Sequence, residues 1–98
     1  MTLDLLTIDM FSDKVGQAFA VEEAGVPPIE LTLIEVTPLQ NFAKAARAPF
    51  SLIFASQGIG VLPQRMYDLR HAALGLKPIF LVPIGIKADV VSYQSVFN

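Results

Sequence analysis

The sequence contains no cysteine and only one histidine, His71, among its 98 residues. Without thiols the chain can form neither a disulfide nor a thiolate metal site, and one imidazole excludes a histidine-rich metal site. The first ten residues include Asp4 and Asp9 and lack the basic and apolar regions of a secretory signal. We therefore expect a cytoplasmic protein that uses no cofactor and no metal.

Charged residues are also scarce. They make up 16% of the chain, against about 25% in a typical soluble domain, and 53% of residues are apolar. The longest charge-free stretch, residues 48–64, is interrupted by proline and glycine and is shorter than the ~20 apolar residues of a spanning helix, so no membrane contact is expected. So few charges favour exposed apolar patches, which usually mark contact surfaces.

The charges that are present divide unevenly along the chain. Residues 1–36 contain seven acids and one base, a balance of −6, whereas residues 37–98 contain six bases and two acids, a balance of +4. One interpretation is that acidic early strands lie beside basic later strands in one sheet. The other is that an acidic face of one subunit meets a basic face of the next.

Alternating apolar residues and turn signals predict six short strands, and hence a single all-β domain over residues 1–98. We expect a mainly antiparallel six-stranded barrel or sandwich. The expected strands lie near residues 19–22, 29–36, 50–55, 66–71, 78–84 and 91–97, and the fifth, a continuous apolar run, is expected to be covered on both faces. The core is predicted to include Phe50, Leu52, Phe54, Tyr67, Leu69, Phe80 and Val82.

One or two short helices accompany these strands in the prediction. The first runs from Ile8 to Val15 after an N-cap at Thr7, with Met10, Phe11 and Val15 on its buried side and Gly16 at the left-handed C′ position. The second follows the capping-box pattern of Thr37, Pro38 and Gln40 and ends near Arg47.

No group of residues makes a convincing catalytic site. His71 with Ser92 or Ser95 would supply part of a hydrolase triad, but its place in an expected strand favours a structural histidine. The carboxylate pairs Asp9 with Asp13 and Glu22 with Glu23 are typical of solvated surface positions. We therefore assign no catalytic, cofactor-binding or metal-binding residue and expect a protein that is not an enzyme.

Two further patterns are weak as binding sites. The segment SQGIGV at residues 56–61 has two glycines but neither the third glycine nor the lysine of a phosphate-binding loop. Arg65 and Arg70 flank Tyr67, yet a sequence pI of about 5.1 argues against nucleic acid as a partner. Ion pairing of these arginines with the early acids is the favoured interpretation.

Six motifs, taken in order, resemble a family of small bacterial proteins of about a hundred residues known only as a domain of unknown function. They are F-x-x-x-V-G-x-x-F-x-V, I-E-L-T-L-I-E-V, P-F-S-L-I-F, L-P-Q-x-x-Y-x-L-x-H, F-L-V-P-I-G and Y-Q-S-V-F-N, and together they extend from Phe11 to Asn98. The positions that match are Phe50, Leu62, Gln64, Tyr67, His71, Phe80, Pro83, Tyr93, Phe97 and Asn98, whereas Arg65 replaces a common glycine. The resemblance implies genomic proximity to phage-tail-collar-like fibre proteins, and no catalytic residue.

These observations lead to two functional hypotheses. The first is a non-enzymatic structural or protein-interaction domain that self-associates or joins a larger assembly, such as a phage-tail-like or fibre structure, and the scarcity of charge is its main support. The alternative is a small β-barrel that binds an apolar ligand in its interior.

Overall fold

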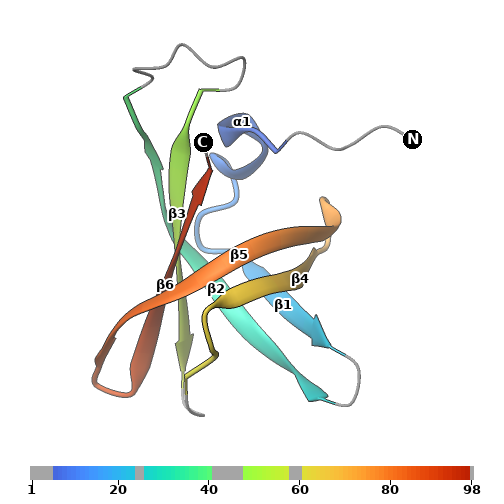
Figure 1. Ribbon diagram of the computed structural model, residues 1–98. Coiled ribbons are helices and arrows are strands. Elements are labelled where there is room, and N and C mark those ends of the chain that lie inside the picture. Colours follow the sequence, from blue (N-terminus) through green and yellow to red (C-terminus); the bar gives the residue numbers. More distant parts are fainter. Residues whose placement is uncertain (1–5, 24–25, 41–47, 58–60, 98) are drawn as a thin grey trace.

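Over the residues that the structure describes, the protein is a closed six-stranded antiparallel β-barrel with one short helix near its N-terminus (Figure 1). The computed structural model describes residues 6–23, 26–40, 48–57 and 61–97. Around the barrel the strands follow the order β1-β2-β3-β6-β5-β4. The elements are α1 (Ile8–Phe11), β1 (Ala18–Glu23), β2 (Val26–Pro38), β3 (Phe50–Gln57), β4 (Arg65–His71), β5 (Gly75–Lys87) and β6 (Val90–Phe97). The all-β antiparallel prediction is confirmed.

Two long strands close the barrel by pairing with different neighbours along their length. Strand β2 pairs with β1 through residues 26–32 and with β3 through residues 32–38. Strand β5 pairs with β4 through residues 75–81 and with β6 through residues 82–87. Bulges between Leu33 and Glu35 and between Pro83 and Gly85 fall in these long strands, where they increase local twist and help the sheet to curve.

Alternation along the strands sets the core. Strand β4 places Tyr67, Leu69 and His71 inside and its other residues outside, as its sequence predicts. Of the predicted core residues, five are buried: Phe50, Leu52, Phe54, Tyr67 and Leu69.

The prediction for β5 is wrong, because this strand is covered on one face only. Ile79 and Leu81 are buried, whereas Phe80 is 39% exposed and Val82 is half-buried. The register explains the difference: Ile79 lies opposite the buried Tyr67, and Phe80 opposite the exposed Met66. Directly opposed residues of an antiparallel pair share a face, so Phe80 points outward.

The N-terminal helix is shorter than predicted. It ends at Phe11 rather than at Val15, and Val15 is 50% exposed instead of buried. Thr7 has the extended conformation of an N-cap but makes no side-chain capping bond. Gly16 adopts the expected positive φ of 89°, and there its amide donates to the Leu33 carbonyl of β2 (2.7 Å), which joins the loop to the sheet.

The prediction of a second helix is wrong at the proposed start of that helix. Thr37 and Pro38 belong to β2, where they lie opposite Ser51 and Phe50 of β3. Because cross-strand pairing continues through both residues, the capping-box pattern does not begin a helix there. Residues 41–47 lie outside the described part of the chain, as do residues 58–60 of the SQGIGV segment.

Aromatic side chains fill one end of the barrel. The buried Phe11 of α1 lies 6.2, 5.9 and 6.2 Å from Phe19, Phe50 and Phe97, measured between ring centroids. The Phe50 and Phe97 rings stack at 4.6 Å, which joins the start of β3 to the end of β6. Figure 1 shows α1 beside this C-terminal end of β6. A helix of one turn is marginal by itself, so this packing is what holds α1 in place.

Tyrosine hydroxyls tie down the segment that enters β4. The Leu62 amide donates to the Tyr93 hydroxyl (2.9 Å), and the Tyr67 hydroxyl donates to the Pro63 carbonyl (2.6 Å). Both rings are buried, so these bonds satisfy polar atoms that would otherwise be costly inside the barrel. Burial raises the pKa of Tyr67, which keeps its hydroxyl protonated as a donor.

Candidate functional site

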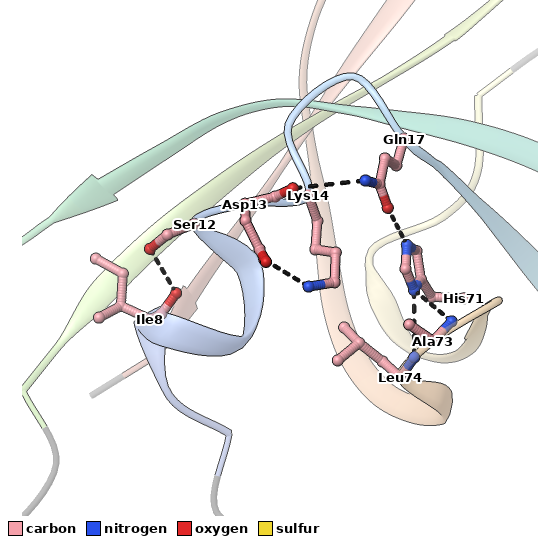
Figure 2. A network of polar contacts seen from close by, with 8 residues as sticks. All are labelled: Ile8, Ser12, Asp13, Lys14, Gln17, His71, Ala73 and Leu74. Atoms are coloured by element: carbon pink, nitrogen blue, oxygen red, sulfur yellow. Dashed lines mark hydrogen bonds and ion pairs between the residues drawn. The ribbon is translucent and has the colours of Figure 1, made fainter.

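His71 is the centre of a polar network at the junction of β4, the following turn and the loop before β1 (Figure 2). Its Nδ1 accepts bonds from the amides of Ala73 (3.0 Å) and Leu74 (3.2 Å), and its Nε2 lies 2.6 Å from Gln17 Oε1. The ring is 5% exposed and packs 4.7 Å from the Phe19 ring.

These contacts define the tautomer of the imidazole. Because Nδ1 accepts from two amides, the proton of the neutral ring lies on Nε2, from which it is donated to Gln17. Both ring nitrogens are therefore committed to holding the β4–β5 turn and the loop before β1. This supports the interpretation of His71 as a structural histidine.

The two serines considered as partners of His71 do not complete a triad. Ser95 is 1% exposed and its Oγ has no hydrogen-bond partner, so it makes no contact of that kind with the imidazole. Ser92 is half-buried on β6, which is separated from β4 by β5 in the barrel. A nucleophile needs a base within hydrogen-bond reach, and the network around His71 provides none for these serines.

Of the carboxylates singled out from the sequence, Asp9 and Asp13 are solvated, as expected. Asp9 and Asp13 are both exposed, and Asp13 accepts a bond from its neighbour Lys14 (2.5 Å), which lowers the pKa of the Asp13 carboxyl. Figure 2 shows this pair beside the loop that leads to Gln17. Exposed carboxylates such as these lack the apolar surroundings of a general acid.

Glu22 and Arg70 form an ion pair between β1 and β4. The Arg70 guanidinium donates from Nε to Glu22 Oε2 and from Nη2 to Glu22 Oε1 (3.2 Å), so the ion pair is bidentate. The hydrogen bond lowers the pKa of Glu22 and raises that of Arg70. The interpretation that early acids pair with later bases in one sheet is therefore correct for this pair.

Arg65 packs against an aromatic ring. Its guanidinium carbon lies 4.6 Å from the centroid of the Tyr67 ring, within the range of a cation–π contact. Arg65 and Tyr67 thus have a packing role within β4.

Among the residues that the structure describes, no cluster of three His, Cys, Asp or Glu side chains is placed to hold a metal ion. In the same part of the chain no helix has the length and apolar character to cross a membrane.

Large apolar side chains are the main unassigned feature of the surface. Those on the barrel strands include Ile34 of β2, Met66 of β4, four residues of β5 and Val96 of β6. The β5 residues are Leu76, Phe80, Ile84 and Ile86, exposed by 43%, 39%, 51% and 65%. No other described strand has as many, so β5 is the centre of the candidate contact surface.

The model of a family described as a domain of unknown function, DUF6916, matches residues 6–97. The chain belongs to this family. No curated protein and no solved structure matches it. Membership confirms the expectation of a family known only as a domain of unknown function.

Within this DUF6916 chain, sequence reasoning missed the apolar surface of β5 and the partners of His71. Phe80 was expected inside, and Ile86 lies beyond the predicted end of the strand. The longer hairpin closes through a two-residue turn, Ala88 and Asp89, which adopts φ values of 52° and 64°. Two successive left-handed residues form the tight turn typical of a β-hairpin, although alanine rarely occupies it.

Proposed function

We propose that this domain is a non-enzymatic structural module that associates with copies of itself or with other proteins in a larger assembly. The observation that carries the proposal is the row of exposed large apolar residues on β5. Apolar side chains gathered on one strand favour association, because contact removes them from water. A phage-tail-like or fibre structure is the assembly we propose, since family resemblance implies proximity to fibre proteins.

The polar chemistry of the domain supports a role without catalysis. His71 is used on both ring nitrogens, and Glu22 and Arg70 neutralise one another. Proteins are the proposed partners rather than nucleic acid or membrane, because the sequence pI is about 5.1. The lack of cysteine fits a cytoplasmic location.

The packing of the barrel favours this proposal over the apolar-ligand alternative. A continuous series of ring contacts, with centroids 4.6–6.2 Å apart, links five phenylalanines at the core of the barrel: Phe54, Phe19, Phe11, Phe50 and Phe97. Aromatic rings at these separations occupy interior space that a bound ligand would need.

Light scattering coupled to size-exclusion chromatography tests self-association. We expect species larger than the 10.6 kDa monomer at micromolar concentration. An apolar contact should persist at about 1 M salt, where exposed charges are almost fully screened. A monomer over about a hundredfold range of concentration would contradict self-association, because an oligomer must respond to concentration.

Affinity capture tests the wider proposal of a protein assembly. The native protein is captured from its source cells and the proteins that accompany it are identified. Recovery of a fibre or tail component supports the proposal even if the isolated chain is monomeric. A monomer that captures no protein but binds an apolar dye stoichiometrically would instead favour the ligand-binding barrel.

A further inference from the structure

Methionine is the side chain of this protein that peroxides attack most readily, because the sequence contains no cysteine. A peroxide converts the methionine thioether to a sulfoxide, and the thioether must be within reach of solvent to react quickly. Two methionines, Met10 and Met66, lie in the part of the chain that the structure describes. Met10 is half-buried and packs against the core, whereas Met66 is 54% exposed. Met66 is therefore the more accessible of the two thioethers.

Met66 lies on the outer face of β4, beside a second exposed apolar side chain. Along β4 it precedes the buried Tyr67, and across the ladder it lies directly opposite Phe80 of β5, which is 39% exposed. Directly opposed residues have Cβ atoms about 4.5–5.5 Å apart, so the two side chains are neighbours on the outer face. We call Met66 and Phe80 the outer pair. Pro78, the preceding outward residue of β5, is also exposed, so the outer pair belongs to a wider apolar surface.

Oxidation of Met66 would change the chemistry of this surface without breaking a bond of the chain. The sulfur lone pair attacks one oxygen of a hydroperoxide, the O–O bond breaks and a sulfur–oxygen bond forms. Sulfur loses an electron pair, and the other peroxide oxygen leaves as water, or as an alcohol from an organic hydroperoxide. A flexible apolar side chain thereby becomes a polar one that carries a hydrogen-bond acceptor.

We propose that Met66 is an oxidation site through which hydroperoxides turn the outer pair from an apolar into a polar surface while the barrel stays folded. The added oxygen lies on the outer side of β4, so the inner side chains of this strand, Tyr67, Leu69 and His71, keep their packing. The backbone pairing of Met66 with Phe80 is also unchanged.

The consequence for assembly rests on the proposed function. A protein contact that covers the outer pair would have to remove the sulfoxide from water, which is unfavourable unless the partner supplies a hydrogen bond. Oxidation of Met66 should therefore weaken such a contact, whereas a contact through another face of the barrel would be unaffected.

Two single variants separate Met66 from the other methionines. Met66→Leu keeps an apolar side chain of similar volume but has no thioether, and Met10→Leu is the matched control that retains Met66. The wild type and both variants are treated with hydrogen peroxide under native conditions, and peptide mass spectrometry follows the gain of one oxygen at each methionine. We expect Met66 to react at least about twofold faster than Met10, because exposure governs access. Equal rates, or faster oxidation of Met10, would overturn the assignment of the site.

Hydrophobic-interaction chromatography measures the surface change whether or not the protein self-associates. After the same peroxide treatment, the wild type and Met10→Leu should elute earlier than their untreated forms, and Met66→Leu should shift least. The melting temperature followed by circular dichroism should be unchanged by oxidation of Met66. An equal shift in Met66→Leu, or loss of the folded state in the oxidised wild type, would contradict the proposal.

Light scattering connects the oxidation site to assembly. In a self-associating wild type, oxidation should raise the concentration needed for association by about tenfold or more, and Met66→Leu should resist this effect. Association that is equally strong after oxidation would refute the weakening of the contact. An untreated wild type that is monomeric would count against self-association alone, because the oxidation site is decided by the mass spectrometry and the chromatography.

Discussion

Two phenylalanines on different strands provide a direct test of which side chains face the core. Phe54 of β3 is 0% exposed and packs edge-to-face on Phe19, with ring centroids 5.4 Å apart. Phe80 of β5 is 39% exposed on the outer face. Truncating each to alanine removes the same atoms, so the difference in unfolding free energy measures the difference in environment.

The expected losses differ by a factor of two or more. Phe54→Ala removes a fully enclosed ring and leaves a cavity, which costs about 3–5 kcal/mol. Phe80→Ala leaves no enclosed cavity and removes a ring that is only partly buried, and a fully buried ring contributes about 1.5–3 kcal/mol by transfer. We therefore expect Phe80→Ala to cost about 1–1.5 kcal/mol.

Urea unfolding followed by circular dichroism measures both values. The two variants should share the wild-type dependence on urea and differ in their midpoints, since neither change alters how much surface unfolding exposes. Equal losses, or a larger loss for Phe80→Ala, would refute the assignment of Phe80 to the outer face. Such a result would restore the two-sided burial of β5 that its sequence predicts.

Four further changes test the network and the closure of the barrel. Phe11→Ala should cost about 3–5 kcal/mol in urea unfolding, because its ring joins α1 to the core. His71→Ala should be less stable than His71→Asn by about 1–3 kcal/mol, since only asparagine keeps an acceptor for the turn amides. Glu22→Gln should lower the melting temperature near neutral pH and match the wild type in strong acid. Because Arg70 lowers the pKa of Glu22, the ion pair stabilises the fold at pH values above the ordinary Glu pKa of 4.5. This stabilisation is lost as the pH falls through the lower pKa of Glu22 in the folded state. Removal of residues 96–98 should unfold or aggregate the protein, because the Phe97 ring packs in the aromatic end, and an unchanged melting temperature would contradict this.

Which residues of a strand face the core was predictable where polar residues alternate with apolar ones. Asp68 and Arg70 mark the outer face of β4, and its inner face follows directly. In the run from Pro78 to Ile84 no charged residue marks either face, so both assignments of β5 agree with its composition. Only the pairing of Tyr67 with Ile79 decides between them, and that register depends on the length of the turn after His71.

The contacts of His71 could not be predicted for a different reason. Its position in a strand favoured a structural role, and the structure supports that interpretation. Gln17 is 54 residues away in sequence, and no local pattern connects it with the histidine. The connection arises because β1 pairs with β4, which brings the loop before β1 to the end of β4. Long-range partners of this kind follow from topology rather than from periodicity.

The uneven distribution of charge along the sequence can be placed in space only from the strand order of the closed barrel. Both early interpretations placed acids against bases, and the Glu22–Arg70 pair satisfies the first of them where β1 and β4 meet. Pairing at that seam cannot reach Glu35, because β2 lies beyond β1 in the closed order. Lys87 also lies outside that seam, on the part of β5 that extends past β4. Glu30 and Glu35 on β2 and Lys87 on β5 are exposed on strands three places apart in the closed order, so the sheet does not pair them with each other.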